Sequence, residues 1–235
     1  MLAKLTVKEF LDKVAGSDPV PGGGSVAALN GAVASALTAM VAGLTIGKKG
    51  YEEHEELMKH ISRLSIRQQE LFVEYIDRDS EAYDHVFGCF KLPKSTDEEK
   101  AARSAAIQEA TRFAALVPMQ VARNACELME IIADVARLGN QNAITDACVA
   151  MMAARSAVLG ALLNVRINLG SLKDITFVDE LKREADHLEQ LACMREKELL
   201  EVVNQEPNQF VMKKLFLVLA AAAIASEYLK LELPP

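Results

Sequence analysis

Two carboxylates are candidates for proton transfer. Asp79 lies in the acidic stretch DRDS within an otherwise apolar predicted helix, and Tyr83 follows on the same face one helical turn later. Asp146 lies at the start of another predicted helix. A carboxylate in such a setting can act as a general base. The alternative for Asp79 is a solvated charge or an ion pair with a neighbouring Arg.

Four Asn residues either precede Asp146 closely in the sequence or share its predicted helix face. Asn140 and Asn142 precede it in the segment GNQNAITD, where they can orient a ligand or simply cap the helix. Asn164 and Asn168 share a helix face with Asp146, because eighteen residues make five turns. Asp146 and Asn164 are nevertheless about 27 Å apart along a straight helix, so they cannot both touch one reacting carbon in one subunit. Asn164 and Asn168 could equally tie helices together.

A glycine-rich loop and a lysine pair are candidates for binding an anion. The glycines leave backbone N–H groups free at a predicted helix start, although they could serve only a tight turn. The two lysines lie at a predicted helix end, where they complement the helix dipole or meet an anionic ligand. These candidates are Gly22, Gly23, Gly24 and Ser25 in the loop, and Lys48 and Lys49 at the helix end.

Several other chemistries are not expected. The four histidines show no HxxxH or HExxH spacing, and the four cysteines form no CxxC pair, so a catalytic metal is not expected. The segment GLTIGKK is one residue too short between its glycines for a P-loop and has no Ser or Thr after the first lysine. The glycine loop follows no predicted strand, which argues against a dinucleotide-binding fold.

The composition narrows the class of protein. Of the 235 residues 51% are hydrophobic and 5% aromatic, and the net charge of -7 argues against a nucleic-acid binder. Dispersed cysteines and an N-terminus without a continuous apolar core predict a cytoplasmic protein that is not exported. The apolar stretch 26–46 is rich in Ala, Gly and Ser, so a buried helix is favoured over a membrane span.

Apolar residues recur at three and four positions throughout, which predicts an all-α fold. We expect a single domain over 1–235, a bundle of long antiparallel helices. Thr6 with Glu9 and Thr96 with Glu99 predict capping boxes. The small-residue helices at 25–47 and 144–168 predict a bundle centre or a homodimer interface. The remaining predicted helices cover 6–16, 52–92, 96–139 with a kink or break at Pro118, 177–203 and 208–235.

Four segments together resemble a known family. In chain order they read PVPGGGSVAALNGAVASALTAMVAGLTIGKKGY; DRDSEAY; KLPKSTDEEKAAR with AIQEAT and VP; and GNQNAITDACVA with NVRIN. They are similar to the cyclodeaminase domain of formiminotransferase-cyclodeaminase and to the related stand-alone bacterial methenyltetrahydrofolate cyclohydrolases. The resemblance covers roughly residues 5 to 200 in the same order, and leaves the predicted helix 208–235 unplaced.

The resemblance implies an all-helical homodimer that acts on one-carbon tetrahydrofolates without a metal or redox cofactor. A cyclohydrolase adds water to the methenyl bridge and forms 10-formyltetrahydrofolate. A cyclodeaminase instead joins N10 to the formimino carbon on N5 and releases ammonia. These 235 residues hold no formiminotransferase domain, so we expect a cyclohydrolase first and a cyclodeaminase served by a separate transferase second. A folate-binding module without catalysis is a third possibility.

The resemblance also implies roles for the candidate residues. Asp79 or Asp146 would accept the proton, and the other carboxylate would bind the amidine-like edge of the pterin. Asn140 and Asn142 would orient pterin or water, while the glycine loop and the lysine pair would hold the anionic glutamyl tail. A dimer in which each Asp146 end faces the partner's Asn164 end would relieve the 27 Å separation. Cys148 and Ala143 depart from the family pattern, which commonly has Gly and Ser there, and this leaves the substrate preference open.

Overall fold

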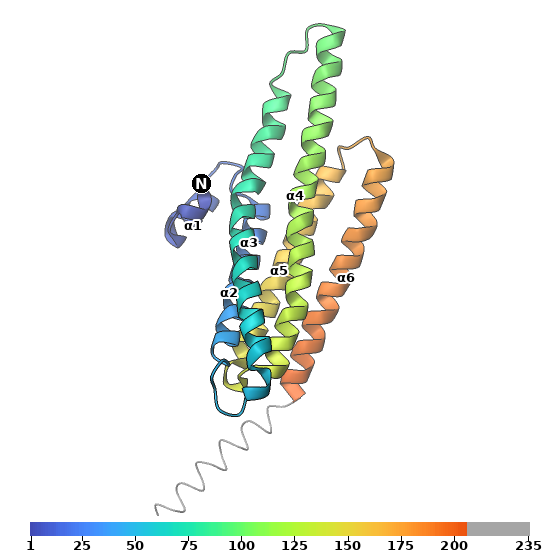
Figure 1. Cartoon of the computed structure of the whole chain (residues 1–235). Coiled ribbons are helices and arrows are strands. Elements are labelled where there is room, and N and C mark those ends of the chain that lie inside the picture. The colour runs from blue at the N-terminus through green and yellow to red at the C-terminus, as the bar shows by residue number, and fades with distance from the viewer. Residues whose placement is uncertain (206–235) are drawn as a thin grey trace, which may run out of the picture. The chain divides into compact units, whose positions relative to one another are not determined.

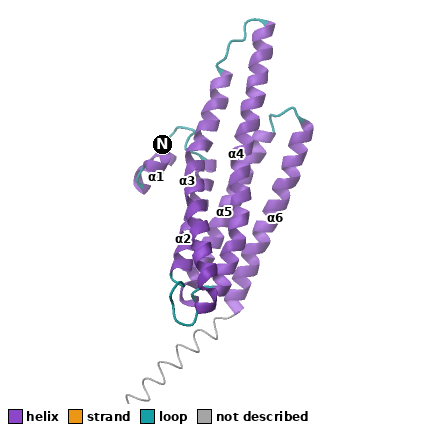
Figure 2. Ribbon diagram, in the orientation of Figure 1, coloured by secondary structure: helices purple, strands orange, loops and turns teal. Residues whose placement is uncertain are grey.

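The computed structural model describes residues 1–205, and helices connected by short turns make up this part of the chain (Figure 2). No strand occurs within these residues, so the all-α prediction is confirmed. Residues 1–196 form one compact unit, and the chain from Lys197 clusters separately. The predicted helix 208–235 lies outside the described residues. The elements are η1 (Leu2–Lys4), α1 (Val7–Val14), α2 (Gly23–Gly43), η2 (Glu52–His54), α3 (Glu55–Phe90), α4 (Asp97–Leu138), η3 (Gln141–Ala143), α5 (Ile144–Leu169) and α6 (Ile175–Gln205).

Helices α2 to α5 form the bundle that holds the candidate residues. Helix α2 packs against α3 and α5, and α4 packs against the same two helices from the other side. Figure 1 shows these helices side by side, with α3 and α4 extending well beyond the start of α2. The connection from α4 to α5 lies at the same end of the bundle as the C-terminus of α2.

Small residues let α2 approach its neighbours closely. A Cβ atom at Gly31 would lie 2.6 Å from the ring of Phe72 on α3. A Cβ at Gly160 on α5 would lie 3.3 Å from that of Ala27. Length and composition alone would let α2 and the stretch Gln141–Leu169 cross a membrane, and half of each apolar window is buried inside the protein.

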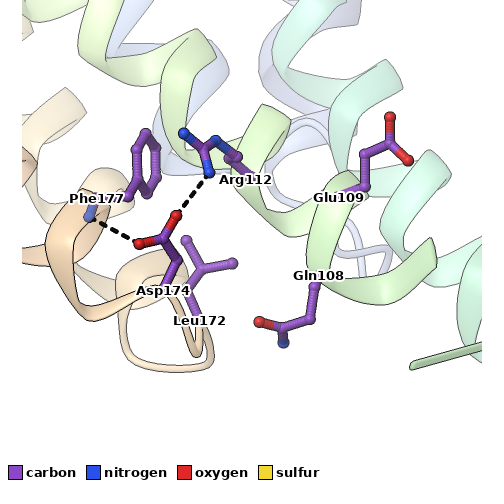
Figure 3. Close-up of a pocket in the computed structure, with 6 residues that line it drawn as sticks. All are labelled: Gln108, Glu109, Arg112, Leu172, Asp174 and Phe177. Carbon is purple, nitrogen blue, oxygen red and sulfur yellow. Dashed lines mark hydrogen bonds and ion pairs between the residues drawn. The ribbon is translucent and has the colours of Figure 1, made fainter. Parts of the chain in front are cut away.

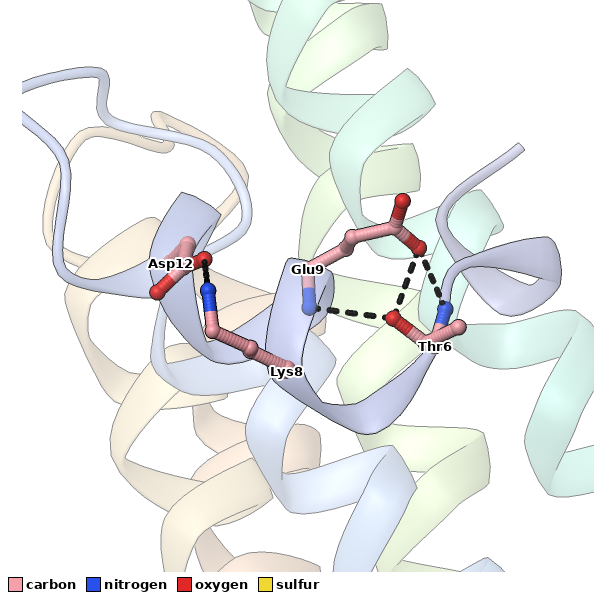
Figure 4. Close-up of polar contacts among 4 residues, drawn as sticks. All are labelled: Thr6, Lys8, Glu9 and Asp12. Carbon is pink, nitrogen blue, oxygen red and sulfur yellow. Dashed lines mark hydrogen bonds and ion pairs between the residues drawn. The ribbon is translucent and has the colours of Figure 1, made fainter.

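Helix starts follow the predicted capping chemistry. The Thr6 hydroxyl accepts a hydrogen bond from the backbone N–H of Glu9, and the Glu9 carboxylate accepts one in return from the Thr6 backbone N–H (Figure 4). Thr96 and Glu99 form the same reciprocal pair at the start of α4. Both predicted capping boxes are confirmed.

The predicted bounds of the glycine-flanked helix were wrong at both ends. Helix α2 begins at Gly23 rather than Ser25, because Gly23 and Gly24 take helical geometry where the helix meets α3 and α5. It ends at Gly43 rather than Gly47, which lies in a turn with a φ of +70°.

Helix α4 continues through Pro118 without a break. Proline has no N–H, so Pro118 leaves the carbonyl oxygen of Ala114, one turn earlier, without its helical partner. The Nδ2 of Asn168 on α5 donates to that oxygen at 2.9 Å. A side chain from another helix therefore supplies the missing hydrogen bond, and the predicted break does not occur.

Helix α6 is held to the bundle by buried apolar side chains and by arginine–carboxylate pairs. Ala185 and Ala192 are fully buried. The Arg123 guanidinium donates to both oxygens of Glu184 in a bidentate pair. Further pairs join Arg166 to Asp186 and Glu189, Arg195 to Glu130, and Arg155 to Glu196.

Candidate active site

Asp79 is the centre of a polar cluster where α2 begins. The fully buried Ser25 hydroxyl lies 3.0 Å from Asp79 Oδ2, 3.0 Å from the carbonyl oxygen of Ile76 and 3.2 Å from the hydroxyl of Ser80. Asp79 itself is half-buried. We call the residues gathered here the carboxylate cluster: Gly23, Gly24, Ser25, Asp79, Ser80 and Asn164.

The surroundings of Asp79 raise the pKa of its carboxyl group above the ordinary value. Burial is the largest cause, and the hydrogen bonds from Ser25 oppose it. No basic side chain forms an ion pair with Asp79 within residues 1–205, so the arginine-paired alternative does not apply there. A carboxyl group with a raised pKa exchanges protons more readily near neutral pH.

Gly24 gives Asp79 its place against α2. A Cβ atom at residue 24 would lie 2.1 Å from Asp79 Oδ1, closer than any side chain can approach. The Asp79 carboxylate therefore lies directly against the first turn of α2. Gly24 is buried against Asp79, whereas Gly22 is half-buried and Gly23 is exposed, so anion binding by Gly22 to Gly24 stays a prediction.

The carboxylate cluster includes Asn164, and two further predicted residues, Tyr83 and Asn168, lie next to it on α3 and α5. The Nδ2 of Asn164 would be 3.4 Å from a Cβ at Gly23, and it donates to the carbonyl oxygen of Gly160 at 2.8 Å. Tyr83 is 41% exposed one turn beyond Asp79 on α3. The amide of Asn168 is engaged by the carbonyl oxygens of α4 and α5, which supports its helix-tying alternative.

A second group, which we call the amide cluster, lies where α2 ends and α5 begins. The Nζ of Lys48 donates to Asn140 Oδ1 at 2.6 Å and lies 5.8 Å from the centroid of the Tyr51 ring. The buried Asn140 donates from its backbone N–H to the Thr45 hydroxyl and from Nδ2 to the carbonyl oxygen of Leu44. The amide cluster comprises Leu44, Thr45, Lys48, Tyr51, Asn140 and Gln141.

Other predicted residues lie next to the amide cluster in the sequence. The backbone N–H of Asn142 donates to Asn140 Oδ1, and its side chain is exposed. Asp146 lies in the first turn of α5, half-buried and without a hydrogen bond or ion pair inside the described part of the chain. Lys49 is exposed.

The structure brings the predicted residues together in two places rather than one. Ser25 and Leu44 belong to opposite ends of α2, which puts about 28 Å of helix between the two clusters. Five members of the two clusters were not among the candidate residues predicted from the sequence: Leu44, Thr45, Tyr51, Ser80 and Gln141. Ser80 follows Asp79 directly and could have been found from the polar stretch, whereas the others depend on how the loop after α2 folds back onto the α4–α5 turn.

A pocket of about 240 Å³ is lined by residues that belong to neither cluster (Figure 3). Its lining includes Arg112, which pairs with Asp174 at 2.9 Å and lies 4.0 Å from the centroid of the Phe177 ring. Gln108 also accepts from the backbone N–H of Lys173, so these contacts hold the α5–α6 turn onto α4. Across residues 1–205, no three His, Cys, Asp or Glu side chains come together as metal ligands would.

Comparison with known proteins identifies the family. Residues 6–187 match the family model described as formiminotransferase-cyclodeaminase. A methenyltetrahydrofolate cyclohydrolase of Methylorubrum extorquens is 41% identical over 208 residues, which cover 88% of this chain and 100% of that protein. A formimidoyltransferase-cyclodeaminase of Rattus norvegicus is 31% identical over 81% of this chain, which spans only 35% of that relative.

A solved structure agrees with the sequence matches. The formiminotetrahydrofolate cyclodeaminase of Thermotoga maritima superposes with a TM-score of 0.77 at 32% identity, covering 86% of this chain and 99% of the other. The family resemblance predicted from the four sequence segments is thereby confirmed. The chain belongs to the formiminotransferase-cyclodeaminase family.

Proposed function

We propose that the protein is a methenyltetrahydrofolate cyclohydrolase, an enzyme that converts 5,10-methenyltetrahydrofolate and water into 10-formyltetrahydrofolate. Its 41% identity over the full length of a relative with that name favours this reaction. The observation that carries the mechanism is Asp79, a half-buried carboxylate whose pKa is raised by burial and whose position is fixed by Ser25 and Gly24.

In the proposed reaction Asp79 removes a proton from water as the water oxygen bonds to the methenyl carbon. The cationic bridge then becomes a neutral tetrahedral carbon between N5 and N10. The hydroxyl proton leaves as the C=O bond forms, the C–N5 bond breaks, and N5 takes up a proton. Of the two protons of water, one ends on N5 and one is released, so a residue that both accepts and donates protons suits the reaction.

The amide cluster supplies groups that can bind the pterin. Lys48 holds Asn140 in place, and Asn142 presents an exposed amide beside it. Asp146 is a carboxylate without a partner inside the described residues, so it is available for the donor edge of the pterin. Because about 28 Å of α2 separates the clusters, one chain does not bring these groups to Asp79.

We propose that a homodimer completes the site by placing one subunit's amide cluster against the carboxylate cluster of its partner. The outward face of α5 supports this arrangement, because Val149, Met152, Leu163 and Ile167 are exposed at helical spacing. Val33 and Met40 on α2 and Leu44 directly after it are also exposed. A second copy of the chain would cover such apolar surfaces.

The first test is the decay of methenyl absorbance with purified protein. We expect Asp79→Asn and Asp146→Asn each to lose most of the activity, and full activity with both changes would discard the carboxylate mechanism. Mixed dimers of the two variants should regain activity, since one of their two sites keeps both native carboxylates. Failure of two folded variants to complement would favour a site within one chain.

The runner-up function is a formimidoyltetrahydrofolate cyclodeaminase, favoured by the Thermotoga maritima structure. Its reaction needs a proton donor for the departing ammonia, which Asp79 could also supply. Formiminotetrahydrofolate given to the same protein separates the two reactions, because only the cyclodeaminase forms the absorbing methenyl product and releases ammonia. Thermal stabilisation by folate without either turnover would instead indicate a binding module.

We further propose that the folate is substrate and that no other cofactor takes part, because neither reaction transfers electrons and the family resemblance implies catalysis without a metal. The chain is proposed to act in the cytoplasm, in keeping with its dispersed cysteines. No nucleic-acid or membrane partner is proposed. A purified sample that is fully active after treatment with a metal chelator would support the cofactor proposal, and loss of activity restored by a metal would reject it.

A further inference from the structure

Helix α3 extends past the point where α2 begins. Asp79 lies beside Gly24 in the first turn of α2, and Phe72, two turns earlier on α3, packs against Gly31. From Asp79 to the end of α3 at Phe90 there remains about 16 Å of helix. Figure 1 shows this part of α3 beside α4 and beyond the start of α2. The side of α3 that α2 covers further down therefore continues without α2 on it.

Aromatic side chains occupy this uncovered side. Tyr83, Phe87 and Phe90 follow Asp79 at helical spacing and are 41%, 51% and 51% exposed. The rings of Tyr83 and Phe87 are stacked, with centroids 6.3 Å apart and planes within 10°. The aromatic rings thus begin one turn beyond the candidate catalytic carboxylate and lead away from it.

Two cations lie at the far end of the aromatic series. The Nζ of Lys91 is 4.5 Å from the centroid of the Phe87 ring. The guanidinium of Arg103, from α4, donates to the carbonyl oxygen of Phe90 and lies 5.6 Å from that ring. Neither cation forms an ion pair with any part of the chain from residue 1 to 205. Both keep N–H groups for an anion.

We propose that Tyr83, Phe87, Phe90, Lys91 and Arg103 form a binding subsite for the aminobenzoyl ring and glutamyl tail of the folate. The inference rests on the proposed function, which puts the reacting carbon at Asp79. An aromatic ring attached to a chain of carboxylates matches a surface that is first aromatic and then cationic, in that order, with increasing distance from the reacting carbon.

The subsite replaces the sequence-based assignment of the tail to the glycine loop and the lysine pair. Gly24 is closed off by Asp79, and Lys48 is bonded to Asn140 at the other end of α2. If the partner's lysines held the tail instead, Lys49→Ala would weaken binding of long-tailed folates and Lys91→Ala would not. Comparing these two variants therefore decides between the two locations.

The test compares 5,10-methenyltetrahydrofolate carrying one glutamate with the form carrying three. Lys91→Ala should raise the KM of the triglutamate form by up to about fivefold relative to the monoglutamate form, as expected for one exposed charge pair. Phe87→Ala should raise KM for both forms by about two- to tenfold with kcat little changed. Lys182→Ala, an exposed lysine on α6, is the matched control.

A non-reacting fragment separates the subsite from catalysis. Calorimetric titration with p-aminobenzoyl-triglutamate should give binding that weakens with added salt and with Lys91→Ala. Turnover by the native protein with unchanged KM values in Lys91→Ala and Phe87→Ala would overturn the subsite and leave the proposed function intact. Absence of turnover with either folate would refute the proposed function, and absence of fragment binding would then refute the subsite independently.

Discussion

The hydrogen bond between Asn168 and the carbonyl oxygen of Ala114 should contribute measurably to stability only because residue 118 is proline. The change to make is Asn168→Leu, which keeps the number and branching of the side-chain heavy atoms and removes the donor. The oxygen of Ala114 would then be left without a partner on a residue that is only 7% exposed. Leaving a buried carbonyl unsatisfied costs about 1–3 kcal/mol.

A double-mutant cycle isolates this contribution. In a Pro118→Ala background the new N–H of residue 118 donates to Ala114 within α4, so Asn168→Leu should cost much less there. We expect a coupling free energy of about 1–2 kcal/mol between the two positions. Urea denaturation of the four proteins at one fixed concentration measures it, because the stability of an oligomer depends on concentration.

Two outcomes would count against the reasoning. Equal costs of Asn168→Leu in both backgrounds would show that Pro118 does not create the need for the amide. A negligible cost in the native background, with the helix content unchanged, would show that water satisfies the Ala114 carbonyl as well as Asn168 does. The stability effect of Pro118→Ala by itself carries no weight, since it also changes helix propensity and packing.

Three further changes test the carboxylate cluster. Burial raises the pKa of Asp79 in the folded protein, so Asp79→Asn should stabilise the protein at pH values above that raised pKa. The gain in unfolding free energy should vanish as the pH falls toward 3.8, and denaturation over this pH range measures it. Ser25→Ala removes a hydrogen bond that lowers the pKa of Asp79, so the acid limb of the kcat/KM profile should move to higher pH. Gly24→Ala should abolish most activity by displacing Asp79, whereas Gly43→Ala, which meets nothing within 4 Å, should fold and turn over normally.

Much of the fold follows from local sequence signals. Thr6 and Thr96 each cap a helix whose start can be predicted from four residues, because the hydrogen bonds of the capping box form within the first turn. The start of α2 and the continuity of α4 at Pro118 depend instead on tertiary contacts. Gly24 leaves room for the Asp79 carboxylate, and Asn168 supplies the hydrogen bond that Pro118 removes. In both pairs the two residues are far apart in the sequence.

The candidate site could be predicted only in part from the sequence, because it too depends on tertiary contacts. Asp79 and Ser25 could each be singled out by residue type, but their contact depends on the packing of α2 on α3. The helical rise per residue does predict from the sequence that Asp146 and Asn164 lie about 27 Å apart on one helix. Helix periodicity could not predict the hydrogen bonds of Tyr51 and Thr45, because the positions of these residues depend on an irregular turn.

The length of α2 connects the architecture to the proposed chemistry. A rigid helix of 21 residues holds the carboxylate cluster at its N-terminus and leads to the amide cluster beyond its C-terminus, so bending cannot bring the two together. In the proposed homodimer, an antiparallel partner would place each end of one subunit beside the opposite end of the other, and two equivalent sites would result from a single two-fold axis. Monomeric protein would then retain the fold and the raised pKa of Asp79 but lose turnover, because its own amide cluster lies about 28 Å of helix away from Asp79.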